Sequence, residues 1–313
     1  MMEKHKRLET LIHVLEKQPF VSKQNILDYF NDFHGMDMSA RTLERDFQSL
    51  AIDYHIAVNY NHTKKGYHLM SEDNDQITSF LSFTGRVYLA ELFRKGLKDF
   101  QDLRKSIKLE DHSDFKGIER VEPIFTAIQQ GRIVEFTHEN YLKKTLKQYR
   151  IAPLQLREYQ GRWYMVGVPL GEDDKFEDNT IIKSFGLARI SKIKMTKIFS
   201  VTEQQFENQL QKFDQIIGLN YDEAEQRENI EIAVSPNQYK YLESLPLHAS
   251  QYKKGERKDG RIIISIHLIP NYELKMQILK LGAEVEVLRP QYLRDEIEEI
   301  LKQSLKNYQN GNK

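Results

Sequence analysis

Residues 1–70 hold three segments with apolar residues at helical spacing, followed by two short runs with alternating spacing. Apolar side chains that recur every three or four residues favour a helix, whereas strict alternation favours a strand. Ser22 and Ser39 are suitable N-cap residues, because a serine oxygen can accept hydrogen bonds from the first amides of a helix. The pattern predicts a helix over 3–17, helices that begin at Ser22 and Ser39, and a hairpin of 56–60 with 66–70.

Three helices followed by a hairpin is the order of a winged helix-turn-helix, whose third helix enters the major groove of DNA. The first turns of that helix carry arginine, serine and threonine. Arginine can bond a guanine edge, and the hydroxyl residues can reach bases or phosphates. The wing tip adds two lysines for the backbone. The candidate DNA contacts are therefore Ser39, Arg41, Thr42, Arg45, Lys64 and Lys65, with Arg41 and Thr42 expected to face bases.

A second interpretation of residues 1–70 is a three-helix protein-interaction domain with an ordinary solvated face. Net charge does not decide between the two. The chain has 46 basic and 46 acidic residues, and residues 1–70 have nine of each. DNA binding needs positive side chains at the phosphates. It would therefore depend here on where the charges lie.

The rest of the chain predicts a connector and two further domains. Residues 71–118 are expected to form a helical connector. Residues 119–200 begin with a helix at 121–130, followed by five strand-like segments at the spacing of a small barrel. Residues 120–200 carry 14 basic and 9 acidic residues. Residues 201–313 predict a β-α-β-β-α-β order, which is typical of a ferredoxin-like domain. The fold class is therefore α+β, with strands expected at 132–137, 147–156, 162–168, 180–187, 190–198, 230–235, 248–253, 261–268 and 284–288.

Two regions of the chain resemble a known family. MSARTLERDFQSLA at 38–51, followed by KKGYHLM at 64–70, resembles the winged helix-turn-helix of DeoR-like and WYL-domain regulators. RIAPLQLREYQGRWYMVGV at 150–168 and IIKSFGLARISKIKM at 181–195 resemble the WYL domain, an Sm-like barrel. The tripeptide that gives this domain its name is present as Trp163, Tyr164 and Met165, and a Met for Leu exchange preserves volume. Phe136 stands where the family usually has tyrosine, unless Tyr141 takes that place.

The resemblance implies a site with an aromatic and several basic residues that senses a nucleotide or single-stranded nucleic acid. Aromatic rings stack on bases, and arginine pairs with phosphate. Alternation along a strand places Trp163 and Tyr164 on opposite faces, so one of them is expected in the core, and we assign Trp163 to packing. Arg189 could equally be a structural ion-pair partner. The candidate ligand residues are Arg150, Tyr164, Lys183 and Arg189.

The C-terminal third resembles the extension that often follows WYL domains, through EIAVSP at 231–236 and LGAEVEVLRPQYLRDEI at 281–297. The resemblance implies dimerisation and closure over a neighbouring WYL domain. The sequence as a whole therefore predicts a homodimeric, ligand-responsive transcriptional repressor that binds a double-stranded DNA operator. Two other functions stay open: an Sm-like single-stranded RNA-binding protein, and a nucleotide-processing enzyme that uses the basic site.

Several functions lack their sequence signatures. No phosphate-binding loop, dinucleotide fingerprint or zinc-protease motif is present. The chain has no cysteine, which excludes disulfides, thiolate metal sites and a cysteine nucleophile. No apolar run reaches the length of a membrane helix, and the first residues have no apolar signal segment. We therefore expect no catalysis, no cofactor, no metal and no membrane partner, in a cytoplasmic protein.

Overall fold

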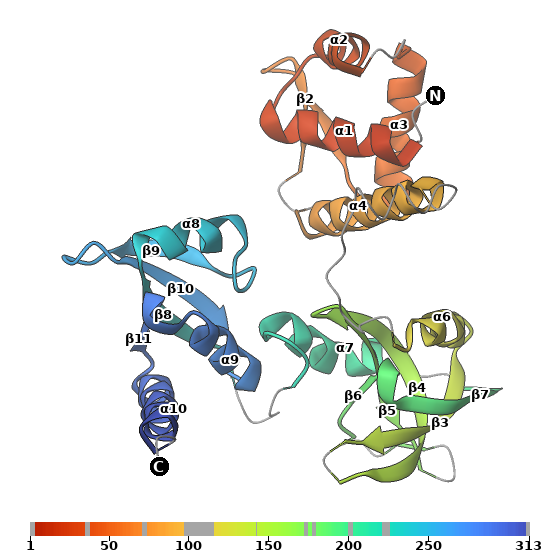
Figure 1. Cartoon of the computed structure of the whole chain (residues 1–313). Coiled ribbons are helices and arrows are strands. Elements are labelled where there is room, and N and C mark those ends of the chain that lie inside the picture. Colours follow the sequence, from red (N-terminus) through yellow and green to blue (C-terminus); the bar gives the residue numbers. More distant parts are fainter. Residues whose placement is uncertain are drawn as a thin grey trace. The chain divides into compact units, whose positions relative to one another are not determined.

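The chain forms two compact units, Met1–Asp111 and His112–Lys313. In this computed structural model, the described residues are 4–34, 38–70, 74–96, 116–141, 143–171, 175–176, 180–199, 203–220 and 226–310. Helices and antiparallel sheets occur together, so the predicted α+β class is confirmed (Figure 1). The finer division into four domains stays a prediction.

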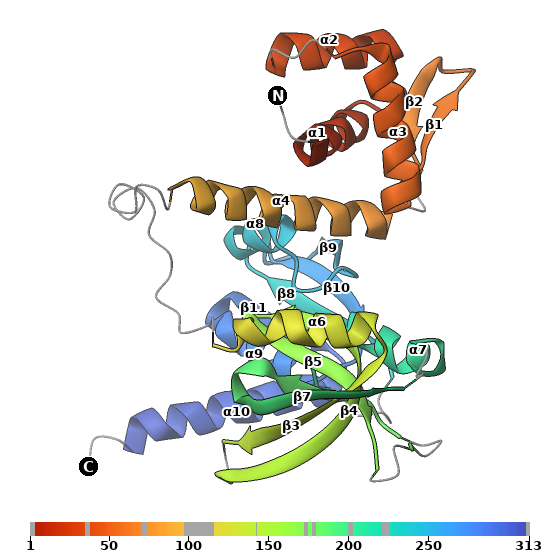
Figure 2. The same cartoon turned by 90° about the vertical axis from the view of Figure 1, so that its right-hand side faces the viewer.

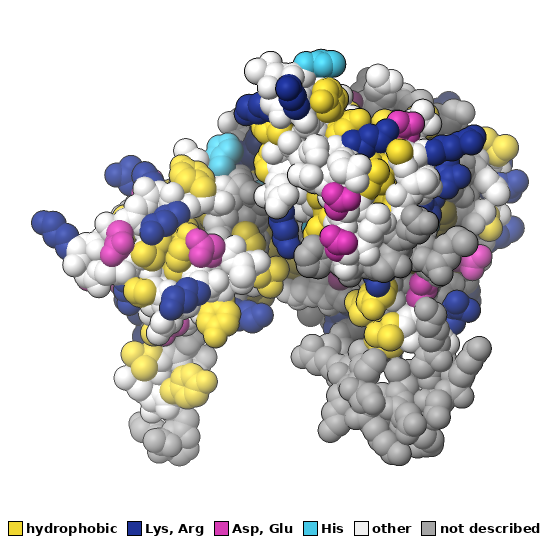
Figure 3. Space-filling model, turned by 90° about the horizontal axis from the view of Figure 1, so that it is seen from above, with side chains coloured by type: hydrophobic (Ala, Val, Ile, Leu, Met, Phe, Trp, Pro, Cys, Tyr) yellow, Lys and Arg dark blue, Asp and Glu magenta, His cyan; other side chains and the backbone are white. Residues whose placement is uncertain are grey.

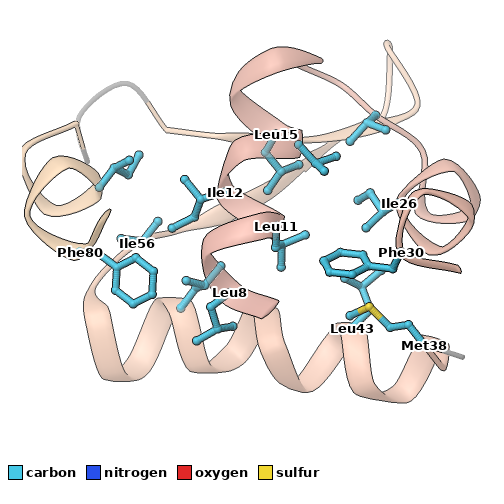
Figure 4. Close-up of a cluster of buried hydrophobic side chains, with 14 residues drawn as sticks. Leu8, Leu11, Ile12, Leu15, Ile26, Phe30, Met38, Leu43, Ile56 and Phe80 are labelled. Carbon is cyan, nitrogen blue, oxygen red and sulfur yellow. The ribbon is translucent and has the colours of Figure 1, made fainter. Parts of the chain in front are cut away.

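The N-terminal unit is built around α1 (Lys4–Lys17), α2 (Lys23–His34) and α3 (Ala40–Tyr54). The predicted caps are present: the Ser22 oxygen accepts from the Asn25 amide at 3.2 Å, and the Ser39 oxygen accepts from the Thr42 amide at 3.1 Å. Leucine and isoleucine side chains of α1 point into the space between the other helices (Figure 4). The fully buried side chains of this core include Leu8, Leu11, Ile12, Ile26, Phe30, Leu43, Leu50 and Ile56.

A hairpin of β1 (Val58–Asn61) and β2 (Gly66–Leu69) follows α3. Val21 pairs with Tyr67, which ties the hairpin back to the segment before α2. Gly66 is required there, because a Cβ atom at this position would overlap the backbone of Phe20. The hairpin predicted at 56–60 and 66–70 is therefore confirmed with slightly shorter strands.

Helix α4 (Asn74–Gly96) closes the described part of the N-terminal unit. Its Ile77 and Phe80 are buried in the core of the three helices, and the Phe80 ring contacts Tyr54 edge-on. The helical character predicted for the connector is confirmed over this range. The remainder of the predicted connector up to residue 115 lies outside the described residues.

The second unit begins with η4 (Ile118–Arg120), α6 (Val121–Gln129) and a five-stranded antiparallel sheet. Its strands are β3 (Arg132–Asn140), β4 (Thr145–Tyr159), β5 (Arg162–Pro169), β6 (Lys183–Gly186) and β7 (Ile190–Ile198), in the order β6-β5-β4-β3-β7. The short η5 (Leu187–Arg189) joins β6 to β7. Figure 2 shows α6 lying across the sheet. In the part of the chain that the structure describes, no pairing joins β6 to β7, so the predicted Sm-like barrel is not confirmed.

A second sheet follows α7 (Glu203–Lys212) and η6 (Phe213–Gln215). It contains β8 (Glu228–Val234), β9 (Tyr252–Glu256), β10 (Ile262–Leu268) and β11 (Val285–Arg289), in the antiparallel order β11-β8-β10-β9. The helices of this part are α8 (Pro236–Ser244), α9 (Tyr272–Lys280) and α10 (Gln291–Asn310), with η7 (Gly282–Glu284) before β11. The predicted element order is confirmed. The strand predicted at 248–253 is wrong in position, because β9 begins only at Tyr252.

Candidate functional site

The first turns of α3 present two arginines to solvent. Arg41 and Arg45 are exposed one turn apart, and neither lies in the core that the opposite face of α3 builds with Leu43 and Leu50. Ser39 has the extended backbone of an N-cap, and its hydroxyl lies 2.9 Å from the hydroxyl of Thr42. Both hydroxyl groups therefore take part in the helix start, and the arginines are the long side chains that reach outward.

Asp46 is part of the same motif, but it does not face solvent. Its side chain is 1% exposed and is held by Arg7 of α1, with Nε to Oδ2 at 2.5 Å and Nη2 to Oδ1 at 2.8 Å. The hydrogen bond to Asp46 raises the pKa of Arg7 and outweighs the opposing effect of burial. Asp46 lies within the stretch 38–51 that carries the family resemblance, where the sequence alone assigned it no role. Its role is to fix the rotation of α3 against α1.

The hairpin tip carries Lys64 and Lys65, both of which are exposed. The Lys64 ammonium lies 3.9 Å from the centroid of the Phe20 ring, a cation–π contact that holds this side chain beside the turn before α2. The Lys64 amide donates to Asn61 Oδ1 at 2.9 Å, and Lys65 has a positive φ of 52°. The two lysines thus stand on a turn that is well fixed by local contacts.

In the second unit, Tyr164 and Arg189 come together around Gly186. Tyr164 of β5 pairs with Gly186 of β6, and Arg189 follows in η5. A Cβ atom placed on Gly186 would lie 3.3 Å from Arg189 Nε and 3.4 Å from Tyr164 Cε1. The absent side chain leaves room for the tyrosine ring and the guanidinium on the same side of β6. Two of the four predicted ligand residues therefore meet.

Sequence reasoning missed a third member of this group, Arg157. In the pairing of β4 with β5, Arg157 lies directly opposite Tyr164. Directly opposed residues of an antiparallel pair have their side chains on the same face. Tyr164 therefore has an arginine as its neighbour on one side and Gly186, with Arg189 beyond it, on the other. An aromatic residue with arginines at neighbouring positions of the sheet is suited to a base or sugar that carries phosphate.

The hairpin turn that joins β4 to β5 was the signal that could have revealed Arg157. Gln160 and Gly161 both have positive φ, which is typical of the two-residue turns that set strand register. They place Tyr159 opposite Arg162. Two residues further from the turn on each strand, the same register places Arg157 opposite Tyr164.

Arg157 has protein partners in this structure. Its Nη2 donates to Asp214 Oδ1 at 2.7 Å and to the Phe213 carbonyl oxygen at 3.4 Å, and its guanidinium lies 5.1 Å from the centroid of the Phe213 ring. Its Nη1 donates to Gln155 Oε1 at 3.0 Å. Arg157 therefore connects the sheet of β5 to η6.

The other two predicted ligand residues lie elsewhere. Arg150 pairs with Glu135 across β3 and β4, with Arg150 Nε 3.3 Å from Glu135 Oε1. Lys183 is exposed at the start of β6, opposite Gly167. The structure thus places Arg150 in an ion pair and Lys183 at the start of the strand that ends at Gly186.

Trp163 and Tyr164 pack against different cores, as alternation along β5 requires. Trp163 packs against the cluster of Phe136, Met165 and Phe185, whereas Tyr164 borders the cluster of Val166 and Val168. Each ring is half-buried. Phe136 itself is 3% exposed and contacts Phe185 edge-on, so it belongs to the core.

His138 and Tyr141 lie close to Arg189. The guanidinium of Arg189 lies 5.5 Å from the centroid of the Tyr141 ring. Burial lowers the pKa of His138, and the positive charge of Arg189 lowers it further. The Nε2 atom of His138 is buried without a hydrogen-bond partner among the described residues. Arg189 thus has His138, Tyr141 and Tyr164 as neighbours, and the lowered pKa of His138 favours its neutral form.

A cavity of about 500 Å³ lies in the N-terminal unit, between α1, the end of α3 and α4. Its lining is mostly apolar and includes Tyr54, Phe80, Phe83 and Val87, with no lysine or arginine. It does not suit an anionic effector. Among the residues that the structure describes, no group of three or more His, Asp or Glu is placed to hold a metal, and no helix could cross a membrane.

Comparisons with known proteins agree with the division of the second unit into two sheets. The WYL domain model matches residues 119–195, and the WCX domain model matches residues 226–305. No curated protein matches the sequence. Among solved structures, the chain is similar to the Proteasome accessory factor B/C (PafBC) of Arthrobacter aurescens, with 13% identity and a TM-score of 0.30, over 94% of this chain and 45% of that chain.

A second similar structure is described as a CRISPR Cas-related protein, with 13% identity and a TM-score of 0.42, over 99% of this chain and 86% of that chain. Both likenesses are distant. The assignment rests on the two domain matches, which together extend from α6 to α10. With a WYL domain followed by a WCX domain, this chain belongs to the WYL-domain regulator family that its sequence resembles.

Proposed function

We propose that this protein is a DNA-binding transcriptional regulator that responds to a nucleotide or a short single-stranded nucleic acid. The observation that carries the proposal is the grouping of Tyr164, Arg157 and Arg189 in a matched WYL domain. An aromatic residue with arginines at neighbouring positions is suited to binding a base and a phosphate together and does not require a catalytic group. We therefore propose a sensor and not an enzyme.

The DNA-binding part of the proposal rests on α3 and the hairpin. The three helices and the hairpin follow the order of a winged helix-turn-helix, in which the third helix lies in the major groove. Arg41 and Arg45 are exposed at its start, and the Ser39 cap offers a helix N-terminus that suits phosphate. Lys64 and Lys65 at the hairpin tip add positive charge for the DNA backbone.

The proposal includes a homodimer, because a helix-turn-helix protein reads two half-sites with two recognition helices. Helix α10 supports a second copy as the partner. Its Leu293 and Ile297 are buried, but the same face continues with Leu301, Leu305 and Tyr308, whose exposed fractions are 48%, 57% and 84%. In Figures 1 and 2 the helix runs on beyond the second sheet, and in Figure 3 it projects at the lower left with yellow hydrophobic side chains on its surface.

The charges of α10 favour an antiparallel arrangement of two copies. Asp295, Glu296, Glu298 and Glu299 lie in its first half, whereas Lys302 and Lys306 lie in its second half. An antiparallel pair would set the acidic half of each helix beside the basic half of the other. A groove of about 180 Å³ beside Ile297 and Leu301 would accept apolar side chains from the partner helix.

We propose repression as the default activity, because a dimer bound at an operator blocks polymerase without any further contact. Deleting the gene is then expected to raise the output of a reporter under its own upstream region. A fall in output would indicate activation.

A gel-shift experiment tests the proposed DNA binding and the proposed effector response together. The full-length protein is titrated onto its own upstream DNA at two salt concentrations, with and without short single-stranded oligonucleotides. A discrete complex that resists nonspecific competitor DNA, and that the oligonucleotides alter, is the expected result. The basic residues of 120–200 favour one rival, single-stranded RNA binding. Tight binding to single strands alone, without a specific duplex complex, would favour that rival.

A further inference from the structure

Arg157 lies where it could bind an anionic effector, but its side chain already forms an ion pair with the carboxylate of Asp214. Its side chain lies beside Tyr164, as the register of β4 and β5 requires. Its Nη2 donates to Asp214 Oδ1 at 2.7 Å. The Arg157 side chain is 22% exposed, whereas that of Asp214 is 72% exposed. Asp214 could therefore turn into water at little cost once its partner is taken.

Asp214 also links the WYL sheet to the WCX sheet. Its carbonyl oxygen lies 3.0 Å from Nε2 of His248, in the segment before β9. A carbonyl oxygen can only accept, so Nε2 carries the proton of this hydrogen bond. Burial lowers the pKa of His248 and so favours the neutral ring, although Asp214 acts in the opposite direction. In the neutral ring Nδ1 is then an acceptor, and the Ser250 amide lies 3.1 Å from it.

The hydrogen bonds continue from Ser250 into the second sheet. The Ser250 hydroxyl donates to the His267 carbonyl oxygen at 2.9 Å and accepts from the His267 amide at 2.9 Å. His267 belongs to β10, the strand between β8 and β9. A continuous set of hydrogen bonds therefore leads from Arg157, beside Tyr164, through Asp214, His248 and Ser250 to β10.

We propose that an anionic effector bound at Tyr164 takes Arg157 from Asp214, and that this exchange loosens η6 and so reports effector binding to the WCX domain. The idea rests on the proposed sensing function and assigns Arg157 to the same site. The phosphate would receive the Nη2 hydrogen bond that Asp214 now accepts. The Asp214 carboxylate would move to solvent, and the Phe213 carbonyl would lose the hydrogen bond from Arg157.

Isothermal titration calorimetry of the full-length protein with four-residue single-stranded oligo(dT) tests the exchange. The oligonucleotide is used with and without a 5′-phosphate, and inorganic phosphate is titrated separately, which distinguishes a terminal phosphate from a backbone or free phosphate. The variants are Arg157→Gln, Asp214→Asn and the double variant. Glu231→Gln is the control, because Glu231 is likewise a carboxylate in an ion pair, with Lys254 on the second sheet, but lies away from Arg157.

Removing the competing carboxylate frees Arg157, so Asp214→Asn is expected to bind the oligonucleotide about two- to fivefold more tightly than wild type. Arg157→Gln is expected to bind more weakly, and the double variant to match Arg157→Gln. Hydrogen–deuterium exchange supplies the second readout. Amides of 211–217 should exchange faster in wild type when the oligonucleotide is added, and should already exchange faster in Asp214→Asn without it.

The failures are distinguishable. If wild type binds none of the probes, the proposed sensing function is wrong, and so is the proposed transfer of Arg157 from Asp214 to the effector. If wild type and Asp214→Asn bind equally while Arg157→Gln binds weakly, Arg157 belongs to the binding site, but the proposed competition between Asp214 and the effector is overturned. If Arg157→Gln binds like wild type, Arg157 is no part of the site and the proposal is overturned. Unchanged amide exchange at 211–217 on binding would refute the transmission to η6.

Discussion

Arg7 of α1 donates two hydrogen bonds to Asp46 of α3, from Nε to Oδ2 at 2.5 Å and from Nη2 to Oδ1 at 2.8 Å. The carboxylate is almost fully buried, and Arg7 is the cation that pairs with it. A bidentate pair fixes orientation as well as distance. The contact therefore sets which residues of α3 point outward, and it connects the stability of the N-terminal unit to the presentation of Arg41 and Arg45.

Arg7→Met should destabilise the N-terminal unit strongly. The variant leaves a buried, unpaired carboxylate, and breaking a buried pair in this way costs about 3–5 kcal/mol. Lys4→Met is the matched control, because Lys4 also connects α1 to α3, through Asp53, but both side chains are 48% exposed. An exposed pair contributes about 0–1 kcal/mol. The only tryptophan is Trp163 in the second unit, so hydrogen exchange of α1 and α3 amides is the appropriate measurement. Equal protection in the two variants would contradict the assigned role.

Arg41→Ala should weaken operator binding by about 1–3 kcal/mol and relax selectivity at one base pair, because arginine contacts to a base edge carry discrimination. Lys65→Gln should instead weaken all sequences alike and reduce the salt dependence of binding by about one ion, as loss of a phosphate contact does. Binding to a set of operator variants at several salt concentrations measures both. Unchanged selectivity in Arg41→Ala would remove it from the base contacts.

The helices and most strands could be predicted because their signals are local. Ser22 and Ser39 mark helix starts by their own side chains, and apolar spacing marks the buried faces. The strand predicted at 248–253 was misplaced because His248 and Ser250 are held by distant partners, Asp214 and His267. Those contacts form a turn that no local pattern reveals. The open pairing of the five-stranded sheet likewise depends on contacts between strands remote in sequence.

The candidate site was predictable only in part for the same reason. Tyr164 and Arg189 could be named from the family resemblance, and they meet because Gly186 lacks a side chain. Arg150 has the expected charge, but its cross-strand neighbour is Glu135, which residue type alone does not reveal. Arg157 was missed because its importance comes from strand register. The sites of DNA and effector binding stay predictions until the variants are measured.

His138 reports on the charge of Arg189. Burial is the main cause of its lowered pKa, and the charge of Arg189 is the second. Arg189→Gln should therefore raise the pKa of His138 part of the way to its ordinary value, which an NMR titration of the ring protons measures. Lys183→Gln, which also removes one positive charge from this sheet, should leave that pKa unchanged. An unaltered titration in Arg189→Gln would show that the two side chains do not interact.

The same shift has a consequence for stability. Because the pKa of His138 is lower in the folded state, the unfolded chain binds more protons in the window between the folded value and the ordinary value of 6.5. The contribution of His138 to the free energy of unfolding is complete above 6.5 and is lost as the pH falls through the folded pKa. In Arg189→Gln this loss should be smaller. Denaturant unfolding at pH 7.5 and at successively lower pH checks the sign.

Leu305→Glu should convert a dimer into a monomer. Leu305 is 57% exposed in the middle of the apolar face that Leu301 and Tyr308 continue, and a charge there would have to be buried between two copies. Gln303→Glu adds the same charge on the opposite side of α10 and should leave the dimer intact. Sedimentation at several concentrations measures the association, and hydrogen exchange of α10 shows that both variants keep the helix. If Leu305→Glu sediments as the wild type does, α10 is not the interface. If wild type is a monomer at every concentration, the two half-sites of an operator must be occupied independently.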